Sequence, residues 1–254
     1  MLISSSKHND LLKLVKLVNN WIYHPDNKFH MWDITHIVTI VSIVMILIFI
    51  YLFRDSLIPY RDHIRISIGI LLIVSRLSID IWYVVTGNWD ISHSLPLELC
   101  SIASLSAAVM LLTKNHFLFE IVYFIGIGGA IQAIFTPNLL FGFPQFRFIQ
   151  FFVDHFCLIL APLIMIWLYQ FTITKASIIK AFISINLLAF IVFIINTLLG
   201  ANYMFLKNKP STPSLLDFFG PYPYYLFTLE FVALFVFFIL YLPFIKSDAS
   251  RSPK

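Results

Sequence analysis

Long runs of apolar residues, separated by short polar stretches, make up most of this chain. A helix needs about 20 mostly apolar residues to cross the hydrocarbon core of a bilayer. Seven runs approach or reach that length, and only helices or closed barrels satisfy backbone hydrogen bonds in lipid. Helix-length runs exclude a barrel, so we predict an all-helical membrane bundle of about seven helices. The predicted spans are roughly residues 34–53, 64–85, 95–112, 117–136, 149–170, 177–200 and 223–244.

The segments that flank this apolar body differ from it. Residues 11–18 alternate apolar side chains with Lys13 and Lys16, which predicts a short amphipathic helix at the membrane interface. A frayed basic tail is the alternative for this segment. Residues 247–254 are polar and predict a disordered tail. The predicted organisation is an interfacial segment at 1–33, a single transmembrane domain at 34–246 and a polar tail at 247–254.

Composition agrees with a membrane protein and restricts its partners. Hydrophobic residues make up 59% of the chain and charged residues 12%, against about 25% charged in a typical soluble domain. The net charge of +4 lies in loops, where it suits anionic lipid headgroups better than nucleic acid. Two cysteines cannot build a disulfide framework or a zinc site unaided. We expect membrane phospholipids as partners, no nucleic acid, and neither a cofactor nor a metal.

The lysines and arginines of the loops predict an orientation in the cell membrane. Nine lie on the side of the C-terminus and three on the other, which predicts a cytoplasmic C-terminus and an extracytoplasmic N-terminus. Four lysines of the N-terminal segment weaken this difference to nine against seven. The nine are Arg54, Arg61, Arg65, Lys114, Lys175, Lys180, Lys246, Arg251 and Lys254; the three are Arg147, Lys207 and Lys209; the four are Lys7, Lys13, Lys16 and Lys28.

The loops with unusual composition all fall on the side opposite the C-terminus. Residues 87–94, 136–148 and 201–221 are rich in proline, glycine and aromatic residues, which fix turns and suit the membrane interface. The loops of the other side are short and plain. This asymmetry predicts that the working face of the protein is the extracytoplasmic one.

Ionisable groups at the third span are the first candidates for chemistry, since such groups are costly in a bilayer and usually mark function. Cys100 follows Glu98 closely, and Pro96 suits the first turn of a helix capped by Ser94 or Leu95. Cys100 would then lie one to one and a half turns into the helix. The helix start favours a thiolate and Glu98 opposes it. The alternative is that Cys100 is simply a small buried hydrophobe.

A second candidate lies about two turns into the fifth span. There His155 is either a proton acceptor or a core histidine bonded to a backbone carbonyl. Asp154 points about 100° away on the same helix and cannot easily orient the His155 ring. A Cys100–His155 pair would need a third group from elsewhere, and the candidates are Glu98, Gln150 and Asn196. We assign Cys157 to the core, although an oxidising compartment would allow a disulfide with Cys100.

The remaining polar groups within the spans have structural explanations. Arg76 and Asp80, four residues apart, should neutralise each other. Glu120 and Glu230 should make polar contacts between helices. Three glycines of the fourth span predict close helix packing rather than a phosphate loop; they are Gly126, Gly128 and Gly129. Asp90 and His93 are too few ligands to predict a metal site.

The order of several short motifs resembles a known family. The chain resembles the YwaF-like bacterial integral membrane proteins, which are similar to the transmembrane protein 164 acyltransferase family of animals. The resemblance covers about residues 30 to 244. Its motifs are Leu95-Pro96-Leu97-Glu98-Leu99-Cys100, Thr136-Pro137-Asn138, Phe152-Val153-Asp154-His155, Asn202-Tyr203-Met204 and Gly220-Pro221-Tyr222-Pro223.

This resemblance implies an acyltransferase that moves a chain between phospholipid and lysophospholipid, with Cys100 and His155 as the catalytic pair. His155 would act as general base for a Cys100 thioester, and N–H groups near residues 97–99 would assist the oxyanion. Arg147, with Lys207 and Lys209, is placed to hold a headgroup phosphate. We also expect Glu98, Asn202 and Tyr203 to bind substrate. A transporter or solute-binding channel, and a non-enzymatic sensor or assembly protein, remain the alternatives.

Overall fold

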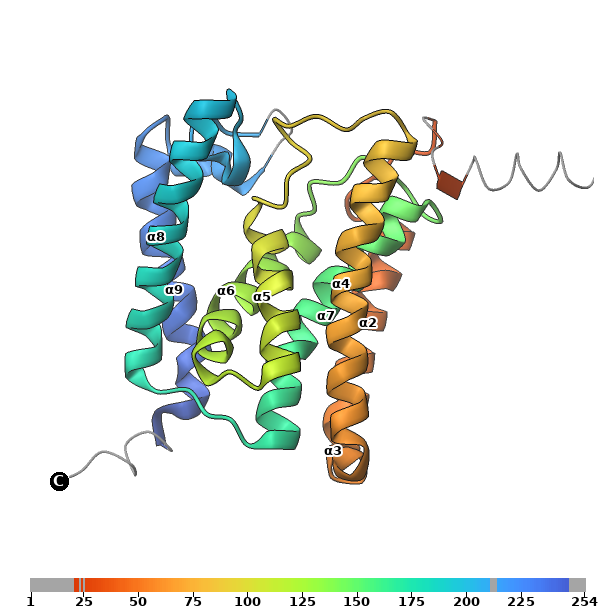
Figure 1. The fold of residues 1–254 in the computed structure, drawn as a ribbon, viewed down its shortest axis with the longest axis vertical. Helices are drawn as coiled ribbons and strands as arrows, with labels where there is room; N and C mark the ends of the chain where they lie inside the picture. Colours follow the sequence, from red (N-terminus) through yellow and green to blue (C-terminus); the bar gives the residue numbers. More distant parts are fainter. Residues whose placement is uncertain (1–20, 23, 25, 211–213, 247–254) are drawn as a thin grey trace, which may run out of the picture.

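The computed structural model describes residues 21–22, 24, 26–210 and 214–246, and this part of the chain is helical without strands (Figure 1). One isolated bridge pairs Lys28 with Phe141. The predicted interfacial helix at 11–18 and tail at 247–254 lie outside the described residues. The α-helices are α2 (Ile34–Leu52), α3 (Arg54–Leu57), α4 (Arg61–Val85), α5 (Leu99–Thr113), α6 (His116–Phe135), α7 (Phe146–Tyr169), α8 (Lys175–Leu199) and α9 (Tyr224–Tyr241). The 3₁₀ helices are η1 (Ile58–Tyr60), η2 (Tyr203–Phe205), η3 (Leu215–Phe219) and η4 (Leu242–Phe244).

The predicted number of spans is confirmed, with one qualification. Six helical segments are long and apolar enough to cross a membrane, and α5 is a shorter apolar helix of 15 residues. Helices α5 and α6 form a tight hairpin, because only Lys114 and Asn115 separate them. Lys114 ends α5 in the left-handed conformation, and the Asn115 side chain accepts a hydrogen bond from the Leu118 N–H at 2.9 Å. The chain is an integral membrane protein.

Four helices form the centre of the bundle. Helices α4, α5, α6 and α7 pack on one another, α8 and α9 cover the side of α6, and α2 lies beside α7 (Figure 1). In the most apolar window of each helix, 67% of α7 is buried, against 11% for α2 and for α8. Because α2 and α8 expose mostly apolar side chains, those faces suit contact with lipid.

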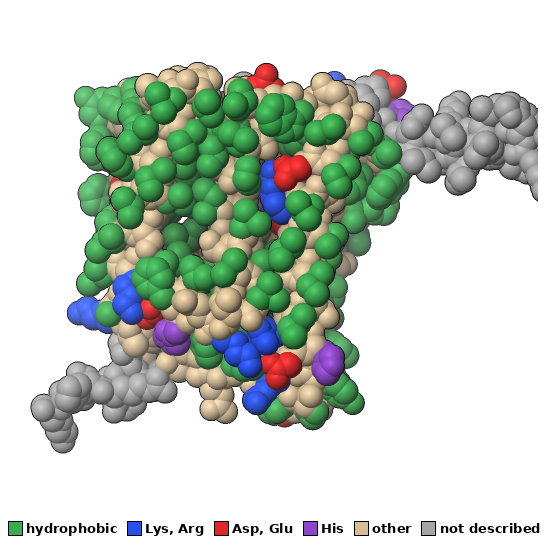
Figure 2. Space-filling view, viewed as in Figure 1, with side chains coloured by type: hydrophobic (Ala, Val, Ile, Leu, Met, Phe, Trp, Pro, Cys, Tyr) green, Lys and Arg blue, Asp and Glu red, His purple; other side chains and the backbone are tan. Residues whose placement is uncertain are grey.

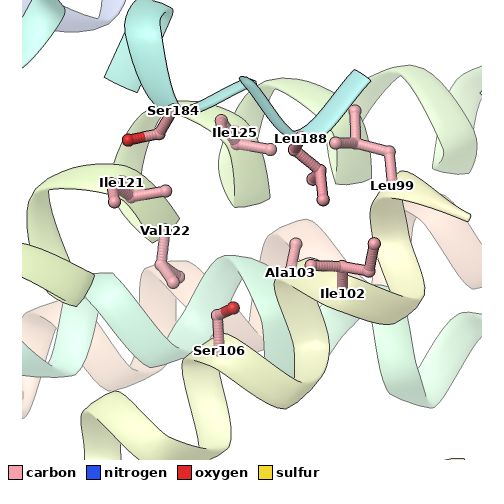
Figure 3. Close-up of a pocket in the computed structure, with 9 residues that line it drawn as sticks. All are labelled: Leu99, Ile102, Ala103, Ser106, Ile121, Val122, Ile125, Ser184 and Leu188. Atoms are coloured by element: carbon pink, nitrogen blue, oxygen red, sulfur yellow. The ribbon is translucent and has the colours of Figure 1, made fainter. Parts of the chain in front are cut away.

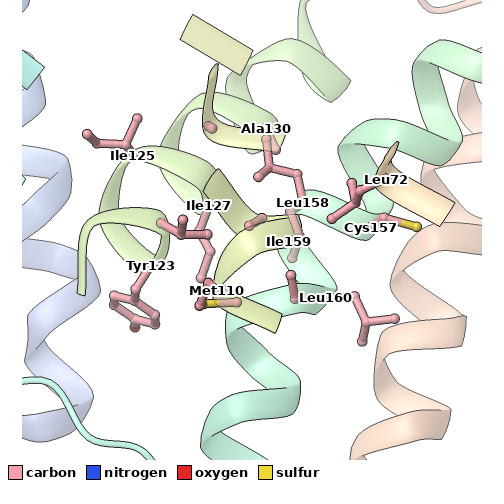
Figure 4. Close-up of a cluster of buried hydrophobic side chains, with 14 of the residues drawn as sticks. Leu72, Met110, Tyr123, Ile125, Ile127, Ala130, Cys157, Leu158, Ile159 and Leu160 are labelled. Carbon is pink, nitrogen blue, oxygen red and sulfur yellow. The ribbon is translucent and has the colours of Figure 1, made fainter. Parts of the chain in front are cut away.

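The core lies where α4, α5, α6 and α7 meet (Figure 4). Two of the three glycines of α6 allow neighbouring helices to approach it closely, as predicted, and the third leaves ordinary contact distance. A Cβ atom on Gly126 would lie 3.0 Å from Leu158 of α7, and one on Gly128 would lie 3.2 Å from Val236 of α9. A Cβ atom on Gly129 would lie 3.8 Å from the Cys100 sulfur of α5. Small residues at helix contacts are typical of membrane bundles.

Polar contacts fasten α8 to the centre and α9 to α8. Glu120 of α6 is buried, and its carboxylate accepts hydrogen bonds from the Ser177 hydroxyl at 2.6 Å and from Lys180 Nζ at 2.7 Å. On the outer side of α8, Asn186 donates to Glu230 of α9 at 2.9 Å. The predicted interhelical roles of both glutamates are confirmed. Many of the described lysine and arginine side chains gather at the end of the bundle where α3 lies (Figure 2).

Candidate functional site

Helix α5 begins at Leu99, four residues later than the sequence predicts. Residues 95–98 form a non-helical approach, so neither Ser94 nor Leu95 caps the helix and Pro96 does not lie in its first turn. Glu98 is the N-cap residue with extended backbone angles, and its side chain makes no capping hydrogen bond. Cys100 is therefore the second residue of α5, and the predicted depth of one to one and a half turns is wrong.

Contacts from the preceding loop and from the distant residues 203–204 hold residues 94–98 in this non-helical conformation. The Ser94 hydroxyl accepts a hydrogen bond from the Asp90 N–H at 3.0 Å, and the Leu95 N–H donates to the Tyr203 hydroxyl at 2.9 Å. The Glu98 carboxylate accepts a hydrogen bond from the Met204 N–H at 3.0 Å. These tertiary contacts, rather than the preference of Pro96 for the first turn of a helix, determine where α5 begins.

The Asn202-Tyr203 motif anchors the long loop above α5. Tyr203 is buried, its hydroxyl donates to the Ile91 carbonyl at 2.7 Å, and its backbone is held on both sides by the Asn196 amide. The Asn202 side chain accepts from the N–H groups of Lys207 and Asn208. Both motif residues thus have structural contacts, and the substrate-binding role we expect for them stays a prediction.

Cys100 lies beside unused hydrogen-bond donors. In the part of the chain that the structure describes, the backbone N–H groups of Leu99, Cys100 and Ser101 have no hydrogen-bond partner, and the first helical bond is that of Ile102 to the Glu98 carbonyl at 3.1 Å. Such groups at a helix start favour a negative charge nearby. Both Cys100 and Cys157 are free thiols, so the disulfide that the sequence leaves open is not formed.

The ring of His155 is fixed by its own helix. Nδ1 is 2.7 Å from the Phe151 carbonyl oxygen, and the Phe151 ring packs on the imidazole with centroids 4.2 Å apart. A carbonyl only accepts, so Nδ1 carries the proton and Nε2 keeps a lone pair in the neutral ring. Among the described residues, none hydrogen-bonds Nε2, and none joins His155 directly to Cys100. The histidine therefore has the tautomer that a general base at Nε2 needs.

The residues expected to orient this pair have other partners. Glu98 accepts from Met204, Asn196 holds the Tyr203 backbone, and Gln150 donates to the Ser75 hydroxyl at 3.0 Å. The Phe151 carbonyl takes the orienting role instead. A bond from His155 to a backbone carbonyl is the alternative that the sequence left open, and the structure contains it. The sequence did not single out Phe151 as the acceptor, because every helical histidine has a carbonyl four residues earlier.

Asp154 connects the two candidate residues electrostatically. Its carboxylate is buried and accepts a hydrogen bond from the Ser104 hydroxyl of α5 at 2.7 Å. It lies close enough to interact with the Cys100 thiol and with the His155 ring. Ser104 stands four residues after Cys100, one turn further along α5. A single carboxylate of α7 is therefore the shared neighbour of both groups.

Two arginines lie near one another in this region, Arg76 of α4 and Arg147 of α7. Arg76 pairs with Asp80, as predicted, and also donates to the Ser101 hydroxyl at 3.2 Å and to the Ser94 carbonyl at 3.2 Å. Its Nε is buried without a partner in the described structure. From the sequence, Arg76 was assigned to this ion pair and, under the transporter alternative, to a polar path; its contact with Ser101, and the Ser104–Asp154 bond, were not predicted. A stripe of serines on an apolar helix was the signal that could have revealed them.

Arg147 lies at the first turn of α7 and faces α4. It donates to the Gln150 side chain, its guanidinium lies 5.7 Å from the centre of the Trp82 ring, and it interacts electrostatically with Arg76 and Asp154. Lys209 lies over the Tyr225 ring at 5.7 Å, in the loop before α9. The phosphate-binding group expected from Arg147, Lys207 and Lys209 stays a prediction, and Arg76 is a cation that this expectation omitted.

An apolar cavity of about 110 Å³ adjoins the start of α5 (Figure 3). It lies between α5, α6 and α8, and Leu99 at its upper wall directly precedes Cys100. The space-filling view is hollowed on this side of the molecule, between α8 and α5 (Figure 2). The lining residues are Leu99, Ile102, Ala103, Ser106, Ile121, Val122, Ile125, Ser184 and Leu188. Among the described residues, no group of His, Cys, Asp and Glu side chains could hold a metal ion.

Comparison with known proteins gives this chain a family. An uncharacterized protein of Treponema pallidum (strain Nichols) is 25% identical over 197 residues, which cover 77% of this chain and 80% of that protein. No solved structure matches the chain. The model of the TMEM164 family matches residues 28–241, a stretch that includes every candidate site residue described above. The chain therefore belongs to the TMEM164 family.

Proposed function

We propose that this protein is a membrane-embedded acyltransferase that moves an acyl chain from a phospholipid to a lysophospholipid through a thioester on Cys100. The observation that carries the proposal is the start of α5. There a free thiol, unpartnered backbone N–H groups and an apolar cavity occur together. A thiol nucleophile, an oxyanion site and a place for an acyl chain are the parts that acyl transfer needs.

In the proposed first half-reaction, His155 Nε2 takes the thiol proton, directly or through one water. The Cys100 sulfur then attacks the ester carbonyl of the donor phospholipid. The N–H groups of Leu99, Cys100 and Ser101 are suited to stabilise the developing oxyanion. As the carbon–oxygen ester bond breaks, the protonated His155 returns its proton to the leaving oxygen. The products are an acyl thioester and a lysophospholipid.

The second half-reaction reverses the first with a different alcohol. His155 Nε2 accepts the proton from the hydroxyl of an acceptor lysophospholipid, whose oxygen attacks the thioester carbonyl. The carbon–sulfur bond breaks, and the thiolate recovers the proton from His155. Asp154 assists by stabilising the imidazolium that forms in both halves, because its carboxylate is a close neighbour of that ring. No net proton or electron is consumed.

The surroundings of Cys100 suit a lipid substrate. The cavity beside Leu99 would take the part of the acyl chain next to the carbonyl, and the exposed apolar faces of the bundle leave the rest of the chain in the membrane. Arg147 at the start of α7 would hold the phosphate, with Arg76 beside it. Membership of the TMEM164 family supports this assignment over a soluble substrate.

A thioester on Cys100 is the direct test. The purified protein is incubated with a phospholipid carrying a labelled acyl chain, and the Cys100 peptide is examined by mass spectrometry. We expect an acyl adduct that neutral hydroxylamine removes. Cys100→Ser should lose both the adduct and at least about 10³-fold of the transfer rate, because a hydroxyl of much higher pKa is a poorer nucleophile beside the same base.

The second thiol provides the control. Cys157 lies in the core among apolar side chains such as Leu72 (Figure 4) and should not carry an acyl group. Cys157→Ala should keep the adduct and the transfer rate. Full transfer by Cys100→Ser would contradict Cys100 as the nucleophile. Absence of both the adduct and transfer in the wild-type protein would favour the transporter or sensor hypothesis for the same polar groups.

A further inference from the structure

A second pocket lies at the end of the bundle opposite Cys100, where α3 is labelled in Figure 1. It has a volume of about 450 Å³ and forms where η1 and the start of α4 meet the end of α7. Apolar, aromatic and cationic side chains share this opening. The lining residues are Ile58, Arg61, Trp167, Leu168, Tyr169 and Gln170.

Arg61 is the cation of this pocket, and its guanidinium is available. It lies 5.1 Å from the centre of the Tyr169 ring, but no hydrogen bond or ion pair engages it within residues 26–210 and 214–246. The neighbouring Arg54 is different. Its side chain pairs with Asp55 at 3.9 Å and donates to the Tyr51 carbonyl at 3.0 Å. Arg61 therefore has unused donors in a pocket, whereas Arg54 has partners of its own.

The charge around this pocket is unbalanced. Three cations surround the Tyr169 ring, namely Arg61, Arg65 and Lys114. A single carboxylate, Asp62, serves two of them, with Lys114 at 3.1 Å and Arg65 at 3.2 Å, and accepts the Tyr169 hydroxyl as well. Asp62 is thus occupied and leaves Arg61 without a counter-ion. Lysines and arginines of this end are visible in Figure 2.

We propose that this pocket binds the phosphate of an anionic phospholipid from the adjacent leaflet. Arg61 donates to the phosphate, since a guanidinium is suited to two parallel hydrogen bonds with its oxygens. Trp167, whose ring centre lies 5.4 Å from that of Tyr51 of α2 in a tilted arrangement, gives an amphipathic wall of the kind found at headgroup depth. Ile58 and Leu168 add apolar contact for the upper acyl chain. The apolar wall favours a lipid phosphate over a free one.

Lipid titration followed by native mass spectrometry tests the site on the full chain. Phosphatidylglycerol and phosphatidylcholine with the same acyl chains are added to the detergent-purified protein. We expect phosphatidylglycerol to bind about fivefold more tightly, the factor that one cation contributes to an anionic lipid. Arg61→Gln should abolish this preference. The matched control Arg54→Gln removes the same charge from the same end of the bundle and should change it less than twofold.

Other outcomes would overturn the proposal. Equal losses in Arg61→Gln and Arg54→Gln would mean diffuse attraction rather than a site. Displacement of phosphatidylglycerol by millimolar inorganic phosphate would mean that the site takes a soluble anion. If Arg61→Gln fails to fold, Trp167→Leu is the second variant, because it keeps every charge. It should weaken the binding of both phosphatidylglycerol and phosphatidylcholine by a few fold. Unchanged binding by that variant would contradict the pocket. None of these readouts depends on transfer activity, so the site stands or falls apart from the acyltransferase proposal.

Discussion

Two groups of ionisable side chains lie within this apolar bundle, and they differ in how completely they are paired. Around Glu120, every polar atom has a partner: Ser177 and Lys180 both donate to the carboxylate. Around Cys100, donors and acceptors remain open, namely the first N–H groups of α5, Nε2 of His155 and Nε of Arg76. A fully paired group, such as that around Glu120, holds helices together, whereas a group with unpaired donors and acceptors, such as that around Cys100, can accept a substrate.

Substitutions in the group around Cys100 should lower activity and leave stability nearly unchanged. We expect His155→Asn to lower the acyl-transfer rate by about 10³-fold, because general-base assistance contributes roughly 10²–10⁴-fold. The asparagine amide N–H takes the position of Nδ1 and can still donate to the Phe151 carbonyl, so the fold should be kept. Transfer rates and thermal unfolding in detergent are measured together. A rate within tenfold of the wild type would show that Nε2 is not the base.

Substitutions in the paired group around Glu120 should lower the free energy of unfolding. We expect Lys180→Met to destabilise the protein by about 3 kcal/mol, because the buried Glu120 carboxylate loses its counter-ion. The unfolding free energy is measured in mixed detergent micelles. Adding Glu120→Gln to this variant should restore part of the loss, since the charge itself is removed. A double variant as unstable as the single one would contradict the pairing.

The positions of the spans and the local charge pairs could be predicted from the sequence, because both depend on residues close together in the chain. The seven apolar runs and the Arg76–Asp80 pair, one turn apart on α4, are of this kind. The start of α5 was not accessible, since Tyr203 and Met204 hold its approach from about 100 residues away. The Ser104–Asp154 bond likewise joins two helices whose relative rotation no local pattern specifies.

Two glycines of α6 compare the tightly packed contact with Leu158 and the looser contact with Cys100. Gly126→Ala should destabilise the protein by about 2 kcal/mol, because its Cβ would press on Leu158 in the filled core. Gly129→Ala should be nearly neutral for stability, since the nearest atom is the Cys100 sulfur at ordinary contact distance. Unfolding free energies of both variants test this. Equal destabilisation would mean that the surroundings of Cys100 are as tightly filled as the core.

Arg147 should give the smallest effect of the proposed substrate contacts. Arg147→Gln is expected to raise KM for the donor phospholipid by about tenfold and to change kcat little, because the phosphate it would hold does not change in the transition state. Steady-state kinetics with the donor lipid separate the two constants. A fall in kcat at unchanged KM would instead place Arg147 at the reacting atoms.

Because α5 starts late, it is shorter than the hydrocarbon core is thick, and the depth of Cys100 depends on bilayer thickness. A helix of 15 residues is about 22 Å long, whereas the hydrocarbon core is about 30 Å thick. With its Thr113 end at one boundary, α5 leaves Cys100 roughly 8 Å below the other, nearer to ester bonds than to headgroups. Transfer rates in vesicles whose lipids differ only in chain length should therefore change with thickness, and rates independent of it would mean that the bilayer adapts around α5.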